Sequence, residues 1–267
     1  MSTEVSETTD TSTLDGKVVI ITGGGQGLGR AVALRAAAKG AKVIIAELNP
    51  TTAASTLKEL RAISADAESY VGDISKPDVA QGLIALAEEK FGSLWGLVNN
   101  AGITQVGTLE NTSEADWDRT LNVNLKSMFL VTKYALPLLR KGHGGSIVNV
   151  CSISGIAGMP EQGAYAPSKG GVASLTQQLA FDYGKEAIRV NAVAPAAMMT
   201  PMIQDNLDGF DTDEQRESWF AWVQDQVLLK RVAQPREVAS AVVFLLSEDA
   251  SFVHGVILPV DGGWASH

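Results

Sequence analysis

KVVIITGGGQGLGRAVALRAAAKG, residues 17–40, joins three patterns that decide the fold. Residues 17–22 form a short run rich in β-branched side chains, which is typical of a strand buried on both faces. A glycine-rich turn follows over Thr22–Arg30, and residues 31–40 then have a helical pattern. A strand, a glycine loop and a helix in this order predict the first βαβ unit of a parallel sheet.

Apolar runs of the same kind alternate with longer amphipathic stretches along the rest of the chain. Runs without polar alternation, separated by helix-length segments, predict parallel strands joined by crossover helices. The predicted fold is α/β: a single-domain Rossmann fold, with a doubly wound parallel β-sheet flanked by helices on both faces. The predicted strands lie at 17–22, 41–47, 94–99, 145–150, 188–193 and 256–260, with a weaker candidate at 68–73.

The 267 residues fit one large α/β domain, and no Pro-rich or Gly/Ser-rich linker divides them. Residues 1–14 are acidic and rich in serine and threonine, so we expect a disordered lead-in there and a single domain over 15–267. Residues 198–230 interrupt the alternation of strands and helices. They form a long polar and aromatic insertion between the run at 188–193 and the next predicted helix.

Charge and composition exclude several classes of partner. The net charge of −9 argues against nucleic acid, which normally needs a basic face. No apolar run approaches the ~18 residues of a membrane span, so we expect no membrane partner. The only cysteine, Cys151, cannot form an internal disulfide, which suits a cytoplasmic location. His143, His254 and His267 are scattered without ligand spacing, so no metal site is expected.

The glycine loop has the features of a dinucleotide site. Gly23, Gly27 and Gly29 permit positive φ, let the backbone approach a pyrophosphate and let the helix pack closely on the strand. The helix N-terminus then presents free N–H groups to the phosphates. A glycine-rich turn alone is weak evidence, but its place between a strand and a helix favours a dinucleotide over a plain turn.

Glu47 ends the second predicted strand, roughly 20 residues beyond the loop. A carboxylate there accepts hydrogen bonds from ribose hydroxyls and repels a 2′-phosphate, which favours NAD over NADP. Arg30 and Lys42 are the nearest cations, and both are interpreted as solvated charges. The alternative for Glu47 is an ordinary solvated strand end.

Tyr165 and Lys169 lie four residues apart, which places them on one face of a helix. A neighbouring ammonium group lowers a phenol's pKa from about 10 and makes it a usable proton donor and acceptor. Taken alone, the pair is more simply a surface tyrosine and lysine. Ser152 follows the predicted strand at 145–150, thirteen residues before Tyr165. Cys151, beside it, is interpreted as a small core side chain rather than a nucleophile.

The order and spacing of these motifs resemble the classical short-chain dehydrogenase/reductase family over Asp15 to Gly263. Any one of the motifs is weak, whereas together they are highly specific. They are T-G-x-x-x-G-x-G at Thr22–Gly29, Asp73–Ile74, N-N-A-G at Asn99–Gly102, N-V-N at Asn122–Asn124, Ser152, Y-x-x-x-K at Tyr165–Lys169, RVNAVAP at 189–195 and VDGGW at 260–264.

The resemblance implies a set of catalytic roles. Tyr165 would be the general acid/base, and Lys169 would lower its pKa and bind the nicotinamide ribose. Ser152 would hydrogen-bond the substrate oxygen, and Asn124 would hold a water that relays protons to solvent. The implied activity is hydride transfer between a nicotinamide cofactor and an alcohol or ketone.

The resemblance also implies the cofactor contacts. Asp73 would contact the adenine, Asn100 the adenine-side ribose, and Val193 and Thr200 the nicotinamide carboxamide. Ala196 departs from the family, which commonly has glycine there, and this puts the local turn geometry in doubt. The full expected set is Gly23, Gln26, Gly27, Leu28, Gly29, Glu47, Asp73, Ile74, Asn100, Ala101, Gly102, Tyr165, Lys169, Val193, Pro195 and Thr200.

By the same resemblance the insertion at 198–230 would be a substrate lid. Its aromatic residues pack an amphipathic helix onto the core in one interpretation and contact substrate in the other. The sequence places no pair of arginines near these residues that could bind a carboxylate or phosphate group of a substrate. The sequence therefore favours a small, mostly apolar secondary alcohol or ketone as substrate. The expected substrate contacts are Ser154, Met159, Gln162, Met199, Met202 and Trp219.

Three alternatives stay open: an NADP-dependent 3-oxoacyl-(acyl-carrier-protein) reductase-like enzyme, a sugar or polyol dehydrogenase, and a non-catalytic dinucleotide-binding sensor or scaffold. An acidic carrier protein would need basic helices, and this chain is negative. A sensor would usually lack Tyr165 or Lys169. The resemblance further implies a homotetramer in which helices at 113–139 and 163–185 pair across a two-fold axis.

Overall fold

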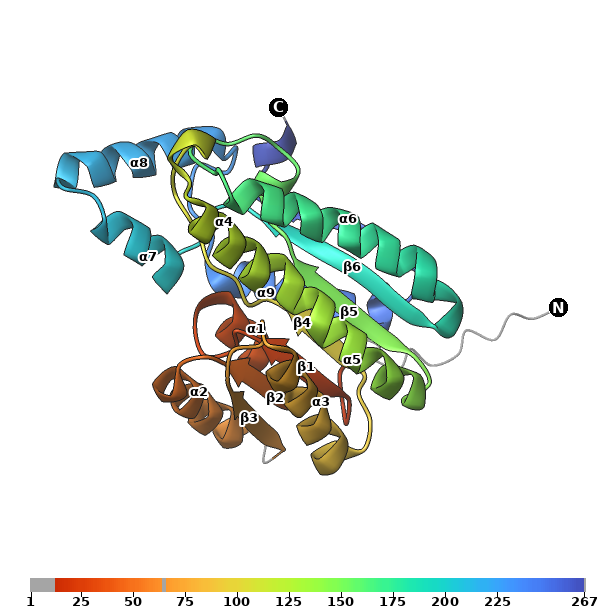
Figure 1. Ribbon diagram of the computed structural model, residues 1–267. Helices are drawn as coiled ribbons and strands as arrows, with labels where there is room; N and C mark the ends of the chain where they lie inside the picture. The colour runs from red at the N-terminus through yellow and green to blue at the C-terminus, as the bar shows by residue number, and fades with distance from the viewer. Residues whose placement is uncertain (1–12, 64–65, 267) are drawn as a thin grey trace, which may run out of the picture.

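The computed structural model describes residues 13–63 and 66–266. Its centre is a parallel sheet with the strand order β3-β2-β1-β4-β5-β6-β7 (Figure 1). Every predicted run forms a strand, including the weak candidate at 68–73, so the predicted doubly wound sheet is confirmed. The strands are β1 (Val18–Thr22), β2 (Lys42–Glu47), β3 (Ala67–Val71), β4 (Gly96–Asn99), β5 (Gly145–Val150), β6 (Ile188–Pro195) and β7 (Ile257–Val260).

Helices cover both faces of this sheet (Figure 1). On one face α1, α2 and α9 pack on the strands, and on the other α3, α5 and α6 do so. The helices are α1 (Gly27–Ala38), α2 (Pro50–Ile63), α3 (Pro77–Phe91), α4 (Glu114–Leu121), α5 (Ser127–Lys141), α6 (Tyr165–Tyr183), α7 (Pro201–Asp208), α8 (Asp213–Gln226) and α9 (Pro235–Leu246).

The apolar runs explain how the sheet is buried from both sides. In β1, Val19 and Ile21 contribute to the cluster under α1 and α9. Val18 and Ile20 contribute to the cluster under α3 and α5. Successive side chains of a strand point to opposite faces, so a strand covered on both faces favours apolar residues at most positions.

The described chain begins before Asp15, which corrects the expected end of the lead-in at residue 14. Leu14 is 1% exposed and belongs to the core cluster under α1. Its backbone N–H donates to the carbonyl oxygen of Lys39 at 2.8 Å. Burial of this leucine therefore fixes the chain just before β1. The rest of the expected lead-in, residues 1–12, lies outside the described residues.

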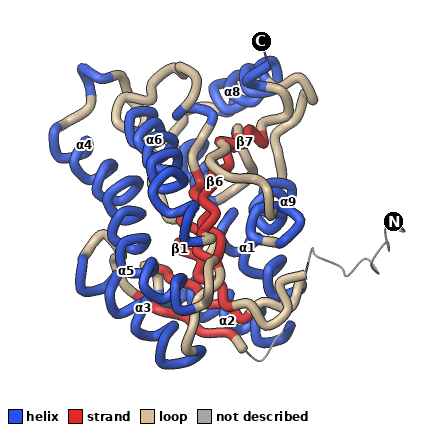
Figure 2. The backbone as a smooth tube through the Cα atoms, turned by 90° about the vertical axis from the view of Figure 1, so that its right-hand side faces the viewer, coloured by secondary structure: helices blue, strands red, loops and turns tan. Residues whose placement is uncertain are grey.

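The segment 198–230 forms two helices, α7 and α8, which stand out from the carboxyl ends of the strands (Figure 1). Thr200 caps α7, and Thr212 with Gln215 forms a capping box on α8. Figure 2 shows α8 beside the C-terminal end of the described chain. Among the described residues, no helix combines the length and apolar composition needed to span a bilayer.

Candidate active site

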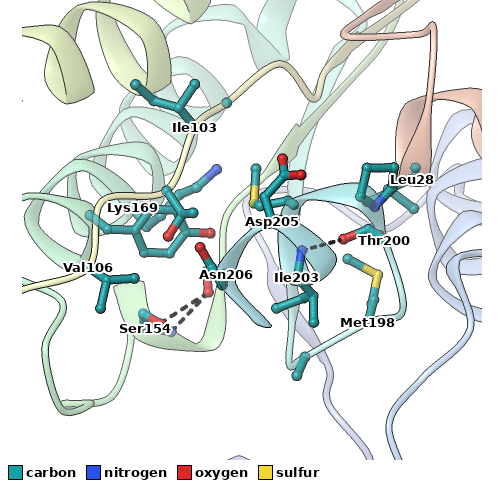
Figure 3. A pocket seen from close by; sticks show the side chains of 18 of the residues that line it. Leu28, Ile103, Val106, Ser154, Lys169, Met198, Thr200, Ile203, Asp205 and Asn206 are labelled. Atoms are coloured by element: carbon teal, nitrogen blue, oxygen red, sulfur yellow. Dashed lines mark hydrogen bonds between the residues drawn. The ribbon is translucent and has the colours of Figure 1, made fainter. Parts of the chain in front are cut away.

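A large cavity opens at the carboxyl ends of the strands, where ligands bind in doubly wound sheets. Its volume of about 1810 Å³ exceeds the ~300–1,000 Å³ typical of a pocket for one small ligand. Lys169 and Ser154 lie on one side of it and Leu28 and Thr200 on the other, with Asn206 of α7 between them (Figure 3). The space suits a long ligand together with a second, smaller one.

The glycine loop forms a tight cradle at one end of the cavity. Gly23 and Gly27 have φ values of 63° and 54°, which side chains rarely adopt. A Cβ on Gly29 would lie 2.0 Å from the carbonyl oxygen of Gly23, so only glycine allows α1 to pack this closely. Gln26 makes no side-chain cap on α1, so the first-turn N–H groups remain available. These features fit the pyrophosphate of a dinucleotide.

Gly29 itself does not line the cavity, which corrects its expected place among the cofactor contacts. It lies behind the loop and is buried. A Cβ there would also lie 2.6 Å from Nδ2 of Asn100. Its contribution is therefore the close packing of helix against loop rather than contact with a ligand.

Glu47 lines the cavity at the end of β2, as expected. Its carboxylate accepts hydrogen bonds from the backbone N–H groups of Gly25 and Leu48, both at 2.9 Å, and of Asn49 at 3.1 Å. The carboxylate therefore holds the glycine loop to the second strand and keeps a negative charge at this place.

The cations weighed against Glu47 are engaged elsewhere. Arg30 pairs with Glu59, and Nζ of Lys42 lies 3.3 Å from Oδ2 of Asp66. The Glu59 side chain raises the pKa of the Arg30 guanidinium by hydrogen bonding. Lys76 is the cationic side chain among the described residues that line the Glu47 end of the cavity.

Asn100 holds the glycine loop with its amide nitrogen. Nδ2 donates to the carbonyl oxygens of Thr22 at 2.9 Å and Gly23 at 3.2 Å. The hydroxyl oxygen of Thr22 accepts in return from the backbone N–H groups of Asn100 and Ala101. The side chain of Asn100 therefore bonds backbone groups of a turn, which is its structural role. Its Oδ1 is the atom left for the expected ribose contact.

Ser152, Tyr165 and Lys169 all line the same cavity, at the end of β5 and the first turn of α6. Nζ of Lys169 lies 5.7 Å from the centroid of the Tyr165 ring. It donates a hydrogen bond to the carbonyl oxygen of Val150 at 2.8 Å. The structure thus brings the hydroxyl, the phenol and the ammonium group together at one end of the cavity.

Burial dominates the acid–base properties of this pair and corrects the expected pKa of the tyrosine. Burial raises the pKa of Tyr165 to about 12, and its side-chain hydrogen bond with Ser152 offsets only part of that rise. Burial lowers the pKa of Lys169 to about 8. Both groups lose water, and this loss outweighs the attraction between ammonium and phenolate that the spacing suggested.

Asn124 does not line the cavity and lies in a π-helical turn, Asn122–Lys126, where it contacts Ser168 beside Lys169. Oδ1 accepts from the N–H of Ile103 at 2.8 Å. Nδ2 donates to the carbonyl of Ile103 at 2.9 Å and to Oγ of Ser168 at 3.0 Å. One amide hydrogen thus holds the segment that follows β4 and the other holds α6, and the water that Asn124 is expected to hold stays a prediction.

Cys151 is 2% exposed. Its thiol contacts the carbonyl oxygen of Lys169 at 3.2 Å, and burial raises its pKa. A thiol that resists ionisation is a poor nucleophile, which agrees with its interpretation as a core side chain.

The substrate end of the cavity lies beyond Ser152. The Ser152 hydroxyl donates to Oγ of Ser154 at 3.3 Å, and Ser154 donates in turn to the Met159 sulfur at 2.9 Å. Five of the six residues expected to contact substrate line the cavity. They are Ser154, Met159, Gln162, Met202 and Trp219.

Two residues expected to contact ligands lie outside the cavity lining. Met199 does not line the cavity: it is 37% exposed, and its backbone N–H bonds the carbonyl of Ala233. Val193 does not line it either, because it lies fully buried in β6 and its carbonyl accepts from the N–H of Cys151. Their neighbours Met198 and Pro195 line the cavity instead.

Several cavity residues were missed by sequence reasoning because they come from remote elements. Trp264, near the C-terminus, lines the cavity, as do Arg119 of α4 and Asp205 of α7. The available signal for Trp264 was its position after two glycines in the VDGGW motif. The other missed residues of the outer wall include Glu161, Asn206, Phe210, Glu214 and Trp222.

Comparison with known proteins places this geometry in a family. A family model described as enoyl-(acyl carrier protein) reductase matches residues 23–265. Levodione reductase of Leifsonia aquatica is 36% identical over 250 residues, which cover 92% of this chain and 93% of that protein. A crystal structure of levodione reductase superposes with a TM-score of 0.90 over 94% of this chain and 98% of that chain.

Other relatives are named for different activities. Cyclopentanol dehydrogenase of a Comamonas species is 38% identical over 251 residues, which cover 94% of this chain and 98% of that protein. The 3-oxoacyl-[acyl-carrier-protein] reductase FabG of Thermotoga maritima is also 38% identical, over 250 residues that cover 94% of this chain and 98% of that protein.

Proposed function

Because the chain belongs to the short-chain dehydrogenase/reductase family, we propose that it prefers NAD and interconverts a small, mostly apolar secondary alcohol and its ketone. It is an NAD(P)-dependent oxidoreductase of alcohols and ketones. One observation carries the proposal: Ser152, Tyr165 and Lys169 meet at the substrate end of the cavity whose other end is the glycine loop.

The bound nicotinamide would supply or accept the hydride. In the reductive direction, Tyr165 donates its phenolic proton to the substrate oxygen, and in the oxidative direction it removes that proton. Ser152 hydrogen-bonds the same oxygen and keeps it within reach of the phenol. Lys169, fixed on the carbonyl of Val150, holds its ammonium beside the tyrosine and would bind the ribose of the cofactor. Positioned proton transfer of this kind contributes ~10²–10⁴ in rate.

The charge of Glu47 supports the preference for NAD. Its carboxylate lies on the cavity wall where the adenine-side ribose would lie. A 2′-phosphate at that position would be repelled, and Arg30 and Lys42 are both paired with other acids. Lys76 is the residue that would work against this preference, and a parallel assay with NADP measures the balance.

The charges around the mouth support a neutral substrate. Glu161, Asp205 and Glu214 line the outer cavity together with one guanidinium, that of Arg119. Three carboxylates against one cation disfavour sugar acids and the phosphate-linked arm of an acyl carrier. The inner wall is apolar, because Ile153, Val223 and Trp264 belong to one buried cluster.

A 3-oxoacyl-(acyl-carrier-protein) reductase is the second candidate function, since a relative named for that activity is 38% identical to this chain. Turnover of a 3-oxoacyl thioester that exceeds turnover of every simple ketone would favour it.

We also propose a homotetramer in the cytosol. Phe129 of α5 and Phe181 of α6 are 48% and 86% exposed, which suits helices that pair with a second copy. A single buried cysteine suits a reducing compartment. Light scattering of the purified protein tests the assembly.

The deciding experiment measures NADH formation at alkaline pH across a panel of secondary alcohols, in parallel with NADP, for the natural protein and Tyr165→Phe. We expect turnover with NAD that falls by about 10²–10⁴ in the variant. Tyr183→Phe is the matched control, because Tyr183 packs on the core outside the cavity lining. Activity that survives in Tyr165→Phe would overturn the proposal, and turnover only with NADP would overturn the role of Glu47.

A further inference from the structure

The C-terminal turn around Trp264 is fixed by its own hydrogen bonds. The Asp261 carboxylate accepts from the N–H groups of Gly263 at 2.9 Å and Ala265 at 2.8 Å, one on each side of the tryptophan. Gly262 and Gly263 have φ values of 64° and 92°, so the chain turns sharply there. The turn therefore presents the indole in one defined direction.

The same turn packs against the link between α8 and α9. The N–H of Leu229 donates to the carbonyl of Gly262 at 3.1 Å. A Cβ on Gly262 would lie 2.6 Å from Cγ1 of Val227, and one on Gly263 would lie 2.9 Å from Cδ1 of Leu228. Two glycines are thus required for the close approach, which anchors the C-terminal turn to the segment that follows α8.

Trp264 lines the cavity although only 8% of it is exposed. Its ring meets that of Trp222 edge to face, with centroids 5.5 Å apart and an interplanar angle of 75°. It shares a buried cluster with Ile153 and Val223. Ile153 directly follows Ser152, so this cluster connects the indole to the segment that carries the serine.

We propose that Trp264 determines substrate size: its indole is the far wall of the substrate end and excludes a large substituent on the ring of a cyclic alcohol or ketone. The inference rests on the proposed function and narrows it from apolar carbonyl compounds in general to compact, monocyclic ones. An aromatic wall at this place excludes by volume, because the indole is nearly buried and packs against Ile153, Val223 and Trp222.

The test compares cyclohexanol with 4-phenylcyclohexanol, which carry the same reacting carbon and differ in bulk. The natural protein should prefer cyclohexanol in kcat/KM. In Trp264→Ala the ratio of kcat/KM for the bulky over the small alcohol should rise at least tenfold, mainly through a lower KM for the bulky one. Trp264→Phe should change the ratio in the same direction and by less.

Trp95→Phe is the matched control, because Trp95 bonds the carbonyl of Leu246 outside the cavity lining. It should leave the ratio unchanged. If both Trp264→Ala and Trp264→Phe lower kcat/KM for the two alcohols equally, Trp264 is only structural and the inference is wrong. Trp264→Leu replaces the alanine variant if that variant does not fold.

Calorimetric titration with cyclohexanone and 4-phenylcyclohexanone in the presence of NADH makes the same comparison without turnover. If Trp264→Ala raises the affinity for the bulky ketone relative to that for the small one, the size limit is supported. This holds even if no alcohol is turned over, and in that case only the proposed function fails. Equal affinities of both ketones for the natural protein and the variant would overturn the size limit while leaving the function intact.

Discussion

Nζ of Lys169 lies 2.8 Å from the carbonyl oxygen of Val150, and the lysine is only 3% exposed. Val150 ends β5, two residues before Ser152, so this hydrogen bond ties the helix that carries Tyr165 to the strand that carries the serine. The ammonium group is held in a site where most of its hydration is lost. This cost of burial is measurable as a dependence of stability on pH.

Lys169→Met should remove a pH dependence of the unfolding free energy. The pKa of Lys169 is about 8 in the folded protein and 10.5 when unperturbed, so the unfolded chain binds more protons between these values. Above pH 10.5 the lysine is neutral in both states, and the folded protein has its full stability. That stability is lost as the pH falls through 8, because the buried amine must then take up a proton. Relative to the variant, the natural protein should therefore gain up to about 3 kcal/mol between pH 7 and 10.5.

Urea unfolding at pH 7 and pH 10 measures this difference. Lys58→Met is the control, because Lys58 is exposed and no buried ammonium is removed. Equal changes of stability with pH in the natural protein and Lys169→Met would contradict the burial cost.

Alcohol oxidation and ketone reduction should respond differently to pH. Burial raises the pKa of Tyr165 to about 12, so the phenol stays protonated over the usual assay range. Reduction needs the protonated phenol, and its kcat/KM should not fall between pH 6 and 9 through loss of this proton. Oxidation needs the phenolate, and its kcat/KM should rise steeply with pH. Initial rates in both directions on one alcohol–ketone pair check this, and oxidation that is flat from pH 7 to 9 would refute it.

Glu47→Arg should shift the cofactor preference toward NADP. The ratio of kcat/KM with NADP to that with NAD should rise at least about tenfold, equivalent to ~1.4 kcal/mol, because a cation replaces the charge that repels the 2′-phosphate. Glu47→Gln, which keeps the shape but removes the charge and one of the two acceptor oxygens, should give a smaller rise. Total activity should fall in Glu47→Arg, since the bonds to Gly25, Leu48 and Asn49 are lost. An unchanged ratio would remove Glu47 from cofactor selection.

Gly29→Ala should damage the glycine loop. Its Cβ would lie 2.0 Å from the Gly23 carbonyl oxygen, and forced overpacking of this kind costs ~1–3 kcal/mol. We expect a lower melting temperature and at least tenfold weaker NADH binding, measured by fluorescence titration. Gly158→Ala is the control, because nothing lies within 4 Å of a Cβ there. NADH affinity that stays unchanged in Gly29→Ala would contradict the close packing described here.

The fold could be predicted from local patterns because a strand buried on both faces is apolar at most positions. The run Val18–Thr22 shows this, and the glycines that follow are dictated by backbone sterics that act within a few residues. The proximity of Tyr165 and Lys169 could equally be predicted, since four residues span about one helical turn. Leu14 was assigned to the lead-in because a single apolar residue in a polar stretch carries no periodicity.

The sequence by itself determined the alternation of strands and helices, the glycine cradle and the spacing of Tyr165 and Lys169 on one helix face, because each depends on neighbours in the chain. Only the tertiary structure decided what surrounds them. Trp264 lines the cavity because Gly262 and Gly263, just before it, pack against Val227 and Leu228, and no local pattern encodes those contacts. The pKa values of Tyr165 and Lys169 move because distant segments exclude water from both. Desolvation is set by everything that packs around a group, and that is known only once the chain has folded.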